Sequence, residues 1–393
     1  MLKRDVKIMG VYLDYNASAP IDERVLEYMI NVYRNNIGNA DSRTHDYGNS
    51  ARKIVENARA QVASILNITK DEVFFTSGAT ESNNIVIQGL RKYGEETGKR
   101  HIITTSIEHK AVLEAAKSLE NYGFEVELIN PDVSGRVSTE LIESRVRDDT
   151  LLVSVMHVNN EIGTIQPIEE IGKYLKSLDE KIYLHVDAVQ SYAKIKFRPS
   201  RYNIDFMTVS GHKFHGPKGI GFMYIKENSK LKPIITGGGQ ESSVRSGTEN
   251  VPGIYGLGKA VEIMNKDLDS KIEKIENLKN LLKEKILKNI DGVKINSPED
   301  GVCHILNVSF ENIRGEVLLH FLEQKNIYVS TGSACSSKKK GSHVLNAIKL
   351  TPDEIEGAIR FSLSDFNTEE EILETVKVLK DSINDLRMII KRR

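Results

Sequence analysis

A lysine lies between two histidines in the segment SGHKFHGPKGIG, residues 210–221. A lysine amine that is desolvated and close to other cations has a lowered pKa, which makes it a nucleophile able to form a Schiff base with an aldehyde. His212 and His215 would act in this direction on Lys213 if they are protonated or close to it. The segment leaves two alternatives open: a metal ion bound by the histidine pair, and a nucleotide bound by the glycines.

Both alternatives have less support in the sequence than the reactive amine. No carboxylate or thiol occurs at metal-ligand spacing from the two histidines, so we expect no metal site. The nucleotide-binding pattern GxxxxGK[ST] does not occur, and the glycines of GPKGIG precede a predicted strand instead of a helix. A Schiff-base amine is therefore our interpretation of Lys213.

A phosphate site is expected in the segment TSGATESNN, which follows the apolar run EVFFT and opens a helical pattern. Gly78 permits a tight turn and Thr80 suits an N-cap, so the amides of the first helical turn form a ready anion site. A capped turn that binds nothing is the alternative, because many helices begin in this way.

Three further segments place polar side chains after predicted strands. HVDAVQ supplies Asp187 and Gln190, IEHKAV supplies His109, and VNNEIGTIQP supplies Asn159, Asn160 and Glu161. The carboxylate is either a turn residue or the partner of a ligand cation, and the amides can orient a ligand or form a turn. A lone histidine is more often structural than catalytic.

An amine, a carboxylate and a phosphate cradle at one sheet edge together describe a receptor for pyridoxal 5'-phosphate. Lys213 would hold the aldehyde, Asp187 would pair with the protonated pyridine nitrogen, and the TSGAT turn would bind the phosphate. We therefore expect pyridoxal 5'-phosphate as the cofactor.

The elements that must position these groups follow an α/β pattern. Between about residues 70 and 225, helical patterns alternate with six β-rich runs: EVFFT, HIITT, LLVSVM, IYLHVD, FMTVS and GFMYI. This alternation predicts a mostly parallel sheet wrapped by helices, in which the carboxyl ends of the strands share one edge.

The C-terminal third has a different pattern. After VPG at 251–253 we expect one long amphipathic helix, which Asp291 and Gly292 end. Beyond it, the strands HILNVSF and IRFSL and the helices EVLLHFLEQ and EEEILETVKVLKDSINDL predict a smaller α+β domain. We expect a large cofactor-binding domain over 16–260 and a small domain built from 1–15 and 261–393.

Charge and cysteine content narrow the class of protein. With 54 basic and 55 acidic residues the formal net charge is −1, so we expect no direct nucleic-acid partner and no membrane partner. No apolar run has the length of a membrane span or a signal-peptide core, which favours a cytoplasmic location. Cys303 lies in an apolar segment and is expected to be buried, whereas Cys335, in STGSACSS, is a candidate reactive thiol.

The chain resembles the pyridoxal-phosphate-dependent cysteine desulfurases of the NifS/IscS type, in aminotransferase class V, which have the aminotransferase-like fold (fold type I). The resemblance runs nearly end to end and in family order through YLDYNASAP, GNADSRTH, FTSGATESNN, IEHKAV, VNNEIGTIQP, HVDAVQ, SGHKFHGPKGIG, GGGQESSVRSGTENV, STGSACSS and IRFSL. So many linked motifs are far more specific than any single pattern.

The resemblance implies a role for each matching residue. Lys213 would be the Schiff-base lysine, Asp187 the partner of the pyridine nitrogen, and His109 the histidine stacked on the ring. The other matches would bind the ring oxygen (Gln190), the phosphate (Ala79, Thr80, Ser210, His212 and, from the other subunit, Thr248) and the substrate carboxylate (Asn159 and Arg360).

The resemblance also implies a reaction. Cys335 would be the catalytic cysteine, on a loop at about 331–342 that carries sulfur to an outside partner. L-cysteine would become L-alanine, and the sulfur would pass from a Cys335 persulfide to an acceptor, an iron-sulfur scaffold or a thiolation protein. A phosphate ligand from the other subunit implies a homodimer.

Three alternatives to a cysteine desulfurase remain open at this point. Another enzyme of the same fold, such as a selenocysteine lyase or an aminotransferase, would have the same site residues but would not need Cys335. A non-catalytic scaffold would take up no cofactor. A nucleotide-binding protein has little support, because neither GGGQ nor GPKGIG lies between a strand and a helix in the required order.

Two segments depart from the family pattern. DYNASAP stands where many relatives have two threonines before the proline, which puts contacts from Ser18 and Ala19 in doubt. SSKKKGSHV, after Cys335, is more basic than the family pattern leads us to expect. A solvated loop tip is the simpler interpretation of these lysines, and an acidic sulfur acceptor or a lowered thiol pKa is the functional one.

The lysines at 338–340 generate a first prediction. Replacing Lys338, Lys339 and Lys340 with serine should raise the pH at which Cys335 is alkylated, because nearby cations stabilise a thiolate. The rate of alkylation of the Cys335 peptide, followed by mass spectrometry against pH, measures this. An unchanged pH profile would show that the lysines are only a solvated tip.

Overall fold

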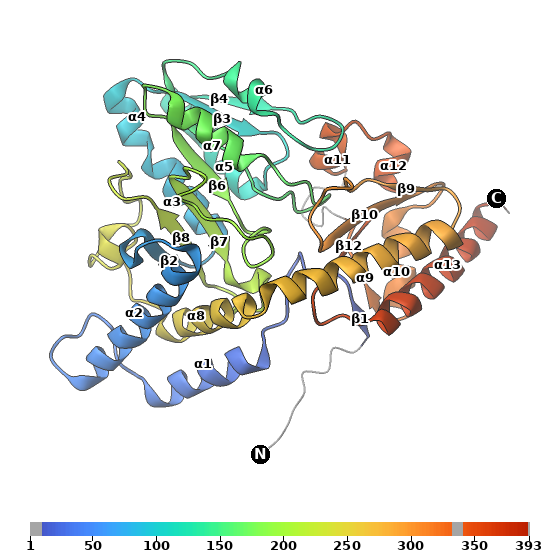
Figure 1. The fold of residues 1–393 in the computed structure, drawn as a ribbon, viewed down its shortest axis with the longest axis horizontal. Coiled ribbons are helices and arrows are strands. Elements are labelled where there is room, and N and C mark those ends of the chain that lie inside the picture. The colour runs from blue at the N-terminus through green and yellow to red at the C-terminus, as the bar shows by residue number, and fades with distance from the viewer. Residues whose placement is uncertain (1–9, 332–340, 392–393) are drawn as a thin grey trace.

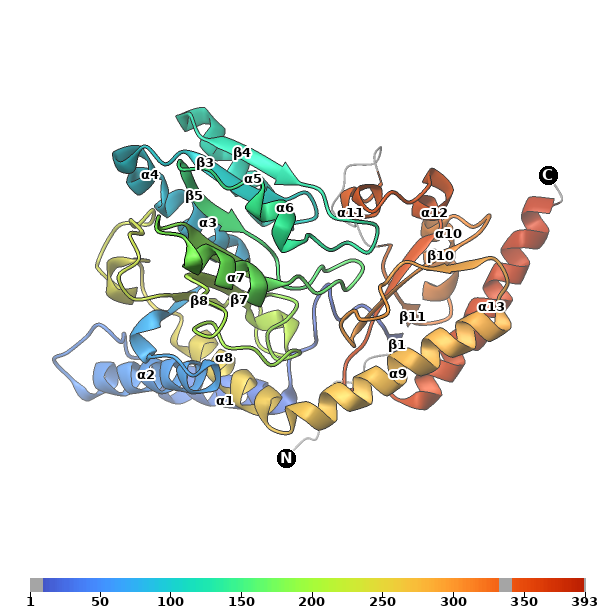
Figure 2. The same ribbon diagram turned by 45° about the horizontal axis from the view of Figure 1, so that its top comes forward.

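The computed structural model describes residues 10–331 and 341–391, which form two bodies joined by a long helix. The larger body has helices on both faces of a seven-stranded sheet, and the smaller body has helices against a three-stranded sheet (Figure 1). Turned by 45° in Figure 2, the two bodies face each other above that helix. The α/β class expected from the sequence is confirmed.

The large sheet contains all six predicted strands. In spatial order its strands are β2 (Val73–Thr76), β8 (Gly221–Ile225), β7 (Phe206–Ser210), β6 (Tyr183–Asp187), β5 (Thr150–Ser154), β3 (His101–Thr105) and β4 (Glu125–Ile129). Only β8 runs against its neighbours, β2 and β7. The carboxyl ends of the other six strands therefore lie at one edge, where β8 begins.

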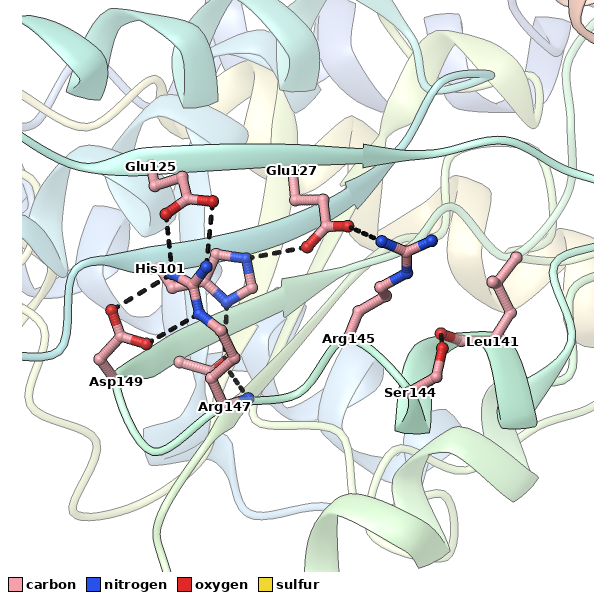
Figure 3. Close-up of polar contacts among 9 residues, drawn as sticks. His101, Glu125, Glu127, Leu141, Ser144, Arg145, Arg147 and Asp149 are labelled. Carbon is pink, nitrogen blue, oxygen red and sulfur yellow. Dashed lines mark hydrogen bonds and ion pairs between the residues drawn. The ribbon is translucent and has the colours of Figure 1, made fainter.

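Strand β4 was not predicted, because its sequence EVELI is not a continuous apolar run like the other six; it alternates charged and apolar residues, as a strand at an exposed sheet edge does. Figure 3 shows that ion pairs link the side chains of β4, across β3, to the segment that precedes β5. Arg147 contacts Glu125 at 2.9 Å and Asp149 at 3.0 Å, and Arg145 contacts Glu127 at 3.0 Å. Charged side chains on an edge strand prevent pairing with another chain. The cluster lies near the amino ends of β3 and β4, on the side of the sheet opposite to the carboxyl ends of these strands.

Helices pack on both faces of the large sheet. One face is covered mainly by α2 (Asp46–Leu66), α6 (Thr139–Glu143), α7 (Ile168–Ser177) and α8 (Val251–Asn265), with α1 (Glu23–Asn35) packed outside them. The other face is covered by α3 (Ala79–Gly89), α4 (Arg91–Thr97) and α5 (Lys110–Lys117). Burial on both faces explains why the central strands read as continuous apolar runs.

The single long helix expected after residue 251 is in fact two helices. α8 ends at Asn265, and α9 (Leu268–Asn289) begins after Asp267, whose backbone is left-handed with φ 57°. The apolar spacing is the same on both sides of this residue, so the hydrophobic pattern did not reveal the break. α9 ends before Asp291, as predicted, and Gly292 has φ 64°.

The small body is built from chain ends that are distant in sequence. Its antiparallel sheet has the order β12 (Ala358–Ser362), β10 (Ile305–Phe310) and β9 (Val293–Ile295), and β1 (Val11–Tyr12) pairs in parallel with β11 (Ile327–Tyr328). Its helices are α9, α10 (Gly315–Glu323), α11 (His343–Ala347), α12 (Pro352–Glu356) and α13 (Glu369–Lys391). Both strands and both helices predicted here are present.

Two separate groups of buried side chains support the proposed domain division. The core that covers the α8 face of the large sheet extends to Met264, whereas the core of the small body contains Val11, Leu13 and residues from Ile275 onward. The division into 16–260 and 1–15 with 261–393 remains our proposal. Within the described residues, no helix has both the length and the apolar character needed to cross a membrane.

The break at Asp267 generates a prediction about stability. Asp267→Val should lower the free energy of unfolding by about 1–2 kcal/mol, because a β-branched residue is strained at positive φ. Asp267→Gly should have little effect, because glycine adopts this conformation freely. Urea unfolding of the two variants measures the difference, and equal stabilities would show that the break imposes no backbone strain.

Candidate active site

A cavity of about 660 Å³ lies at the edge where β2, β6 and β7 end. Its wall includes residues of the large body, Ser330 and Arg360 of the small body, and part of residues 13–22, which we call the strap. Most predicted site residues that the structure describes line it: Ala79, Thr80, His109, Asp187, Gln190, Ser210, His212, Lys213 and Arg360. Its size suits a cofactor with a small substrate.

A second, larger hollow of about 1080 Å³ lies between residues 192–202 and residues 265–270. None of the predicted site residues that the structure describes lines this hollow. The ion pair between Lys196 and Asp269, at 2.6 Å, joins its two sides. The smaller cavity is therefore the candidate active site, because the chemistry gathers there.

Lys213 lies on a short 3-10 turn, η3 (Gly211–Lys213), that directly follows β7. Its amine donates hydrogen bonds to the backbone carbonyls of Asn16 and Ala17, the second at 3.0 Å. The strap thus holds the lysine side chain against the cavity wall.

The two histidines beside Lys213 are not the cations that the sequence suggested. Burial, together with nearby lysines, lowers the pKa of His212 to about 4. His215 does not line the cavity, and burial lowers its pKa as well, while its ring bonds to the Pro20 carbonyl and to Ser364, both at 2.9 Å. Both rings are therefore neutral at neutral pH, so they do not act on Lys213 as cations, although His212 lies on the same cavity wall.

The predicted phosphate turn begins helix α3 at the cavity. Gly78, not Thr80, is the N-cap, and its φ of 149° favours glycine; Thr80 is the second residue of the helix. The first-turn amides of α3 and the Ser210 hydroxyl on β7 make this wall a donor surface for an anion. Glu81, also on the wall, is paired with Arg245 at 2.6 Å, which offsets its negative charge.

Asp187 is held by a residue to which the sequence analysis assigned no role. Asn83 on α3 donates to Asp187 Oδ2 at 3.0 Å, and its own Oδ1 accepts from Thr208 on β7 at 2.7 Å. The backbone amide of Val189 donates to the other carboxylate oxygen at 3.1 Å. Because Asn83 and Thr208 are fully buried, this series of hydrogen bonds fixes the Asp187 carboxylate in one orientation.

His109 and Gln190 reach the cavity from the turns after β3 and β6. His109 Nδ1 accepts from the Ala111 amide at 3.1 Å at the start of α5, so the neutral ring carries its proton on Nε2. Burial lowers the pKa of His109, an effect that Asp187 opposes and Lys213 reinforces. Gln190 Nε2 donates to the Asn16 carbonyl at 3.4 Å.

Arg360 comes from β12 in the small body and is almost completely buried. It donates to Asp14 Oδ1 at 2.6 Å and to the Asn160 carbonyl at 3.1 Å, and its Nε has no hydrogen-bond partner. A buried guanidinium with a free donor at a cavity suits a carboxylate ligand. Asp14, which the sequence analysis missed, sets its orientation.

Asn159 does not have the position expected of a ligand for the substrate carboxylate. Its side chain donates to the Ile107 carbonyl at 3.1 Å and accepts from the amides of Glu161 and Ile162. These bonds use its donor and acceptor to hold the turn after β5. The next residue, Asn160, lines the cavity in its place.

Two further residues named in the sequence analysis lie outside the cavity, and Cys335 is not among the residues that the structure describes. Thr248 is exposed and does not line the cavity. Exposure is expected of a residue that contributes to the site of another subunit. Cys303 is buried, as expected, and burial raises the pKa of its thiol to about 11.

The strap also makes contacts that the departures from the family pattern had put in doubt. The Ser18 hydroxyl lies 3.3 Å from His212 Nδ1, and the Ala19 amide donates to the His212 carbonyl at 2.9 Å. Ser18 therefore supports the same wall as the phosphate turn.

The residues present fit pyridoxal 5'-phosphate. The cavity has an amine, a buried carboxylate and an anion-binding helix start on its wall, and it offers two buried groups without a partner, Asn16 Oδ1 and Arg360 Nε. Buried polar atoms without partners are uncommon in folded proteins, and a ligand in the cavity can satisfy them.

Comparison with known proteins agrees with this geometry. The model of the aminotransferase class-V family matches residues 11–374. The chain is 41% identical to the cysteine desulfurase IscS of Dictyoglomus turgidum, over 96% of both chains. It is 43% identical to the mitochondrial cysteine desulfurase of Saccharomyces cerevisiae, over 96% of this chain and 76% of that protein. The chain belongs to the cysteine desulfurases of the aminotransferase class-V family.

Solved structures of family members share the fold. A NifS-like protein matches with a TM-score of 0.90 and 42% identity, over 96% of this chain and all of that chain. A structure of SspA in complex with cysteine matches with a TM-score of 0.81 and 38% identity, over 91% of this chain and all of the other. The predicted aminotransferase-like fold is confirmed, and the family uses pyridoxal 5'-phosphate.

The bond from Asn83 to Asp187 generates a prediction about the cofactor. Asn83→Ala should raise the dissociation constant for pyridoxal 5'-phosphate about tenfold, because a hydrogen bond to a charged group contributes roughly 1.5 kcal/mol or more. Thr208→Val should have a smaller effect in the same direction, because it removes only the support of Asn83. Fluorescence titration of the apoprotein measures both, and unchanged affinity in Asn83→Ala would show that Asp187 needs no such support.

Proposed function

We propose that this protein removes sulfur from L-cysteine, releases L-alanine and passes the sulfur to an acceptor protein through a persulfide on Cys335. The observation that carries the proposal is one cavity whose wall holds Lys213, Asp187, the start of α3 and Arg360. An amine, an acid and a carboxylate receptor in that arrangement suit an amino-acid substrate held against a pyridine ring.

The cofactor site is proposed on the same residues. When bound, pyridoxal 5'-phosphate supplies an electron sink that stabilises a carbanion at the α-carbon of the substrate. Asp187 would pair with the protonated pyridine nitrogen, Gln190 would bind the ring oxygen, and His109 would lie against the ring. Ser210, His212 and the backbone and side chain of residues 79–80 would hold the phosphate, with Thr248 of a second subunit.

The substrate is oriented from the small body. Arg360 binds the substrate carboxylate through the donor that Asp14 and the Asn160 carbonyl leave available. Lys213 Nζ, in its unprotonated form, would accept the α-proton of the substrate. His109 offers Nε2–H as a donor toward the cavity, because its Nδ1 is engaged by α5.

Sulfur transfer is assigned to Cys335. Its thiolate attacks the substrate sulfur, so that a sulfur-sulfur bond forms and the carbon-sulfur bond breaks with its electron pair remaining on the carbon side. Protonation of the carbon fragment then gives L-alanine. The persulfide gives its outer sulfur to an acceptor, for which iron-sulfur cluster assembly and other thio-cofactor synthesis are the proposed destinations.

A homodimer and a cytoplasmic location belong to the same proposal. A threonine from a second subunit would complete the phosphate site, and in this chain Thr248 is exposed and available for such a contact. Size-exclusion chromatography with light scattering, together with loss of cofactor affinity in Thr248→Ala, tests the shared site.

The decisive experiment incubates the purified holoenzyme with L-cysteine. We expect stoichiometric L-alanine and, on the Cys335 peptide, a mass gain of one sulfur atom. The Cys335→Ser variant should lose at least about 99% of sulfide release, because it lacks the nucleophile. It should keep the yellow colour of the bound cofactor. Lys213→Ala should lose both activity and that colour.

The alternatives predict other results in the same experiment. An aminotransferase would keep its activity in Cys335→Ser and would yield a keto acid instead of alanine. A selenocysteine lyase would release selenide from selenocysteine with little turnover of cysteine. A colourless protein that takes up no pyridoxal 5'-phosphate would contradict the whole proposal and favour a scaffold.

A further inference from the structure

A short helix of the small body brings a histidine to the cavity wall that the sequence analysis did not consider. Helix α11 lies on the side of the small body that faces the large body (Figures 1 and 2), and its first residue, His343, lines the cavity. An apolar cluster holds α11 against the large body: Ile107, Met156 and Ile162 on one side, and Val344, Leu345, Ile348 and Ala358 on the other. The position of His343 is therefore set by contacts between the two bodies.

Hydrogen bonds to the large body fix the start of α11. His343 Nε2 donates to the backbone carbonyl of Glu108 at 3.0 Å, on the turn after β3. The hydroxyl of Ser342 donates to Glu161 Oε2, and as the N-cap of α11 it accepts from the Leu345 amide at 3.1 Å. The His343 ring is thus held at one nitrogen and through the residue that precedes it.

The bond to Glu108 settles which nitrogen of the His343 ring carries the proton. A carbonyl can only accept, so Nε2 carries the hydrogen and Nδ1 of the neutral ring is an acceptor. Nδ1 forms no hydrogen bond with the described residues. His109 has the opposite arrangement, with Nδ1 engaged and Nε2–H presented, and His212 lies beside a hydroxyl that can donate or accept. His343 is therefore the histidine of this wall whose free nitrogen is fixed as an acceptor.

An L-cysteine substrate has three groups that the cavity must place. Its carboxylate is assigned to Arg360 and its amine to the side of Lys213, so its sulfhydryl still needs a receptor. Glu161 lies close enough to both Arg360 and His343 for their charges to act on it, and all three line the cavity. His343 is therefore on the side of the cavity where Arg360 would hold the substrate. A sulfhydryl is a weak hydrogen-bond donor, for which a neutral imidazole nitrogen is a suitable acceptor.

We propose that His343 Nδ1 accepts a hydrogen bond from the sulfhydryl of the substrate and so favours L-cysteine over amino acids that have no donor at this position. The bond fixes the torsion about the Cα–Cβ bond of the substrate, which directs its sulfur for transfer. No proton moves in this step, because the hydrogen stays on the sulfur. The inference rests on the proposed function, since it takes L-cysteine as the substrate and Arg360 as the receptor of its carboxylate.

Glu161 is the other acceptor on this side of the wall. Ser342 donates to one of its oxygens, and the other forms no hydrogen bond with the described residues. Burial raises the pKa of Glu161, against the effects of the Ser342 bond and of the charges on His343 and Arg360. A carboxyl group that retains a proton is a poorer acceptor than a neutral imidazole. Glu161 therefore serves to hold Ser342 and the start of α11, and His343 is the receptor.

The test uses two substitutions that separate the two nitrogens of the His343 ring. The side-chain nitrogen of glutamine can reach the Glu108 carbonyl as Nε2 does, whereas the side-chain oxygen of asparagine lies near the position of Nδ1. His343→Gln therefore keeps the anchor and displaces the acceptor, and His343→Asn keeps the acceptor and loses the anchor. Both are combined with Cys335→Ser, so that bound L-cysteine is not turned over.

The measurement is the dissociation constant of L-cysteine relative to that of L-alanine, which lacks only the sulfur. Both are titrated into the holoprotein at about pH 7.5, where most sulfhydryl groups carry their proton and most histidine rings are neutral, and followed by the absorbance of the cofactor. Relative to Cys335→Ser alone, His343→Gln should lower the selectivity for L-cysteine about three- to tenfold, as expected for the loss of one hydrogen bond, with L-alanine binding unchanged. His343→Asn should keep the selectivity within about twofold.

The matched control is His320→Gln, which makes the same change at an exposed histidine of α10 that does not line the cavity. It should change neither dissociation constant. Glu161→Gln should also keep the selectivity, because the amide oxygen of glutamine can still accept from Ser342.

The outcomes separate this inference from the function on which it rests. Unchanged selectivity in His343→Gln would overturn it, and a loss confined to His343→Asn would show that only the anchor to Glu108 matters. Selectivity lost in Glu161→Gln but kept in His343→Gln would assign the sulfhydryl to Glu161 instead. Failure of the proposed function is a different result: the Cys335→Ser holoprotein would then show no change in cofactor absorbance with either amino acid.

Discussion

The backbone carbonyl of Asn16 is the point at which the parts of the active site meet. It accepts hydrogen bonds from Lys213 and Gln190, which follow two different strands of the large sheet. The side-chain amide of the same residue donates to the Asn160 carbonyl, which also accepts from Arg360 of the small body. One residue of the strap therefore links the amine, the ring-binding amide and the carboxylate receptor.

The strap can do this because it is tied to both bodies. Its amides at Leu13 and Tyr15 donate to Tyr328 and Ser362 of the small body. Its amides at Ala19 and Asp22 donate to the carbonyls of His212 and His215 beside β7. A displacement of one body relative to the other would break one of these sets of bonds, so the relative position of Arg360 and Lys213 depends on the strap.

The electrostatic character of the cavity follows from which groups keep their charge when buried. Hydrogen bonds and a cation hold the carboxylates of the wall in place, as Asn83 holds Asp187 and Arg360 holds Asp14. The histidine rings of the wall are kept neutral, because burial lowers the pKa of His212 to about 4 and also lowers the pKa of His109. The wall therefore combines ionisable side chains, some of them paired as Arg360 is with Asp14, with neutral histidine rings.

The sequence by itself determined the six apolar strands, the edge at which they end, and the residues Lys213, Asp187 and the α3 turn, because these depend on local patterns of period, turn chemistry and motif order. It did not yield strand β4, because EVELI is not a continuous apolar run like the other six strands, or the break at Asp267, where one apolar stripe runs through two helices. Only the tertiary structure decided that Asn160 and not Asn159 lines the cavity, that Asn83 holds Asp187, and that burial keeps the histidines beside Lys213 neutral. The physical reason is that hydrogen-bond partners and desolvation arise from segments far apart in the chain, and no local pattern in the sequence records them.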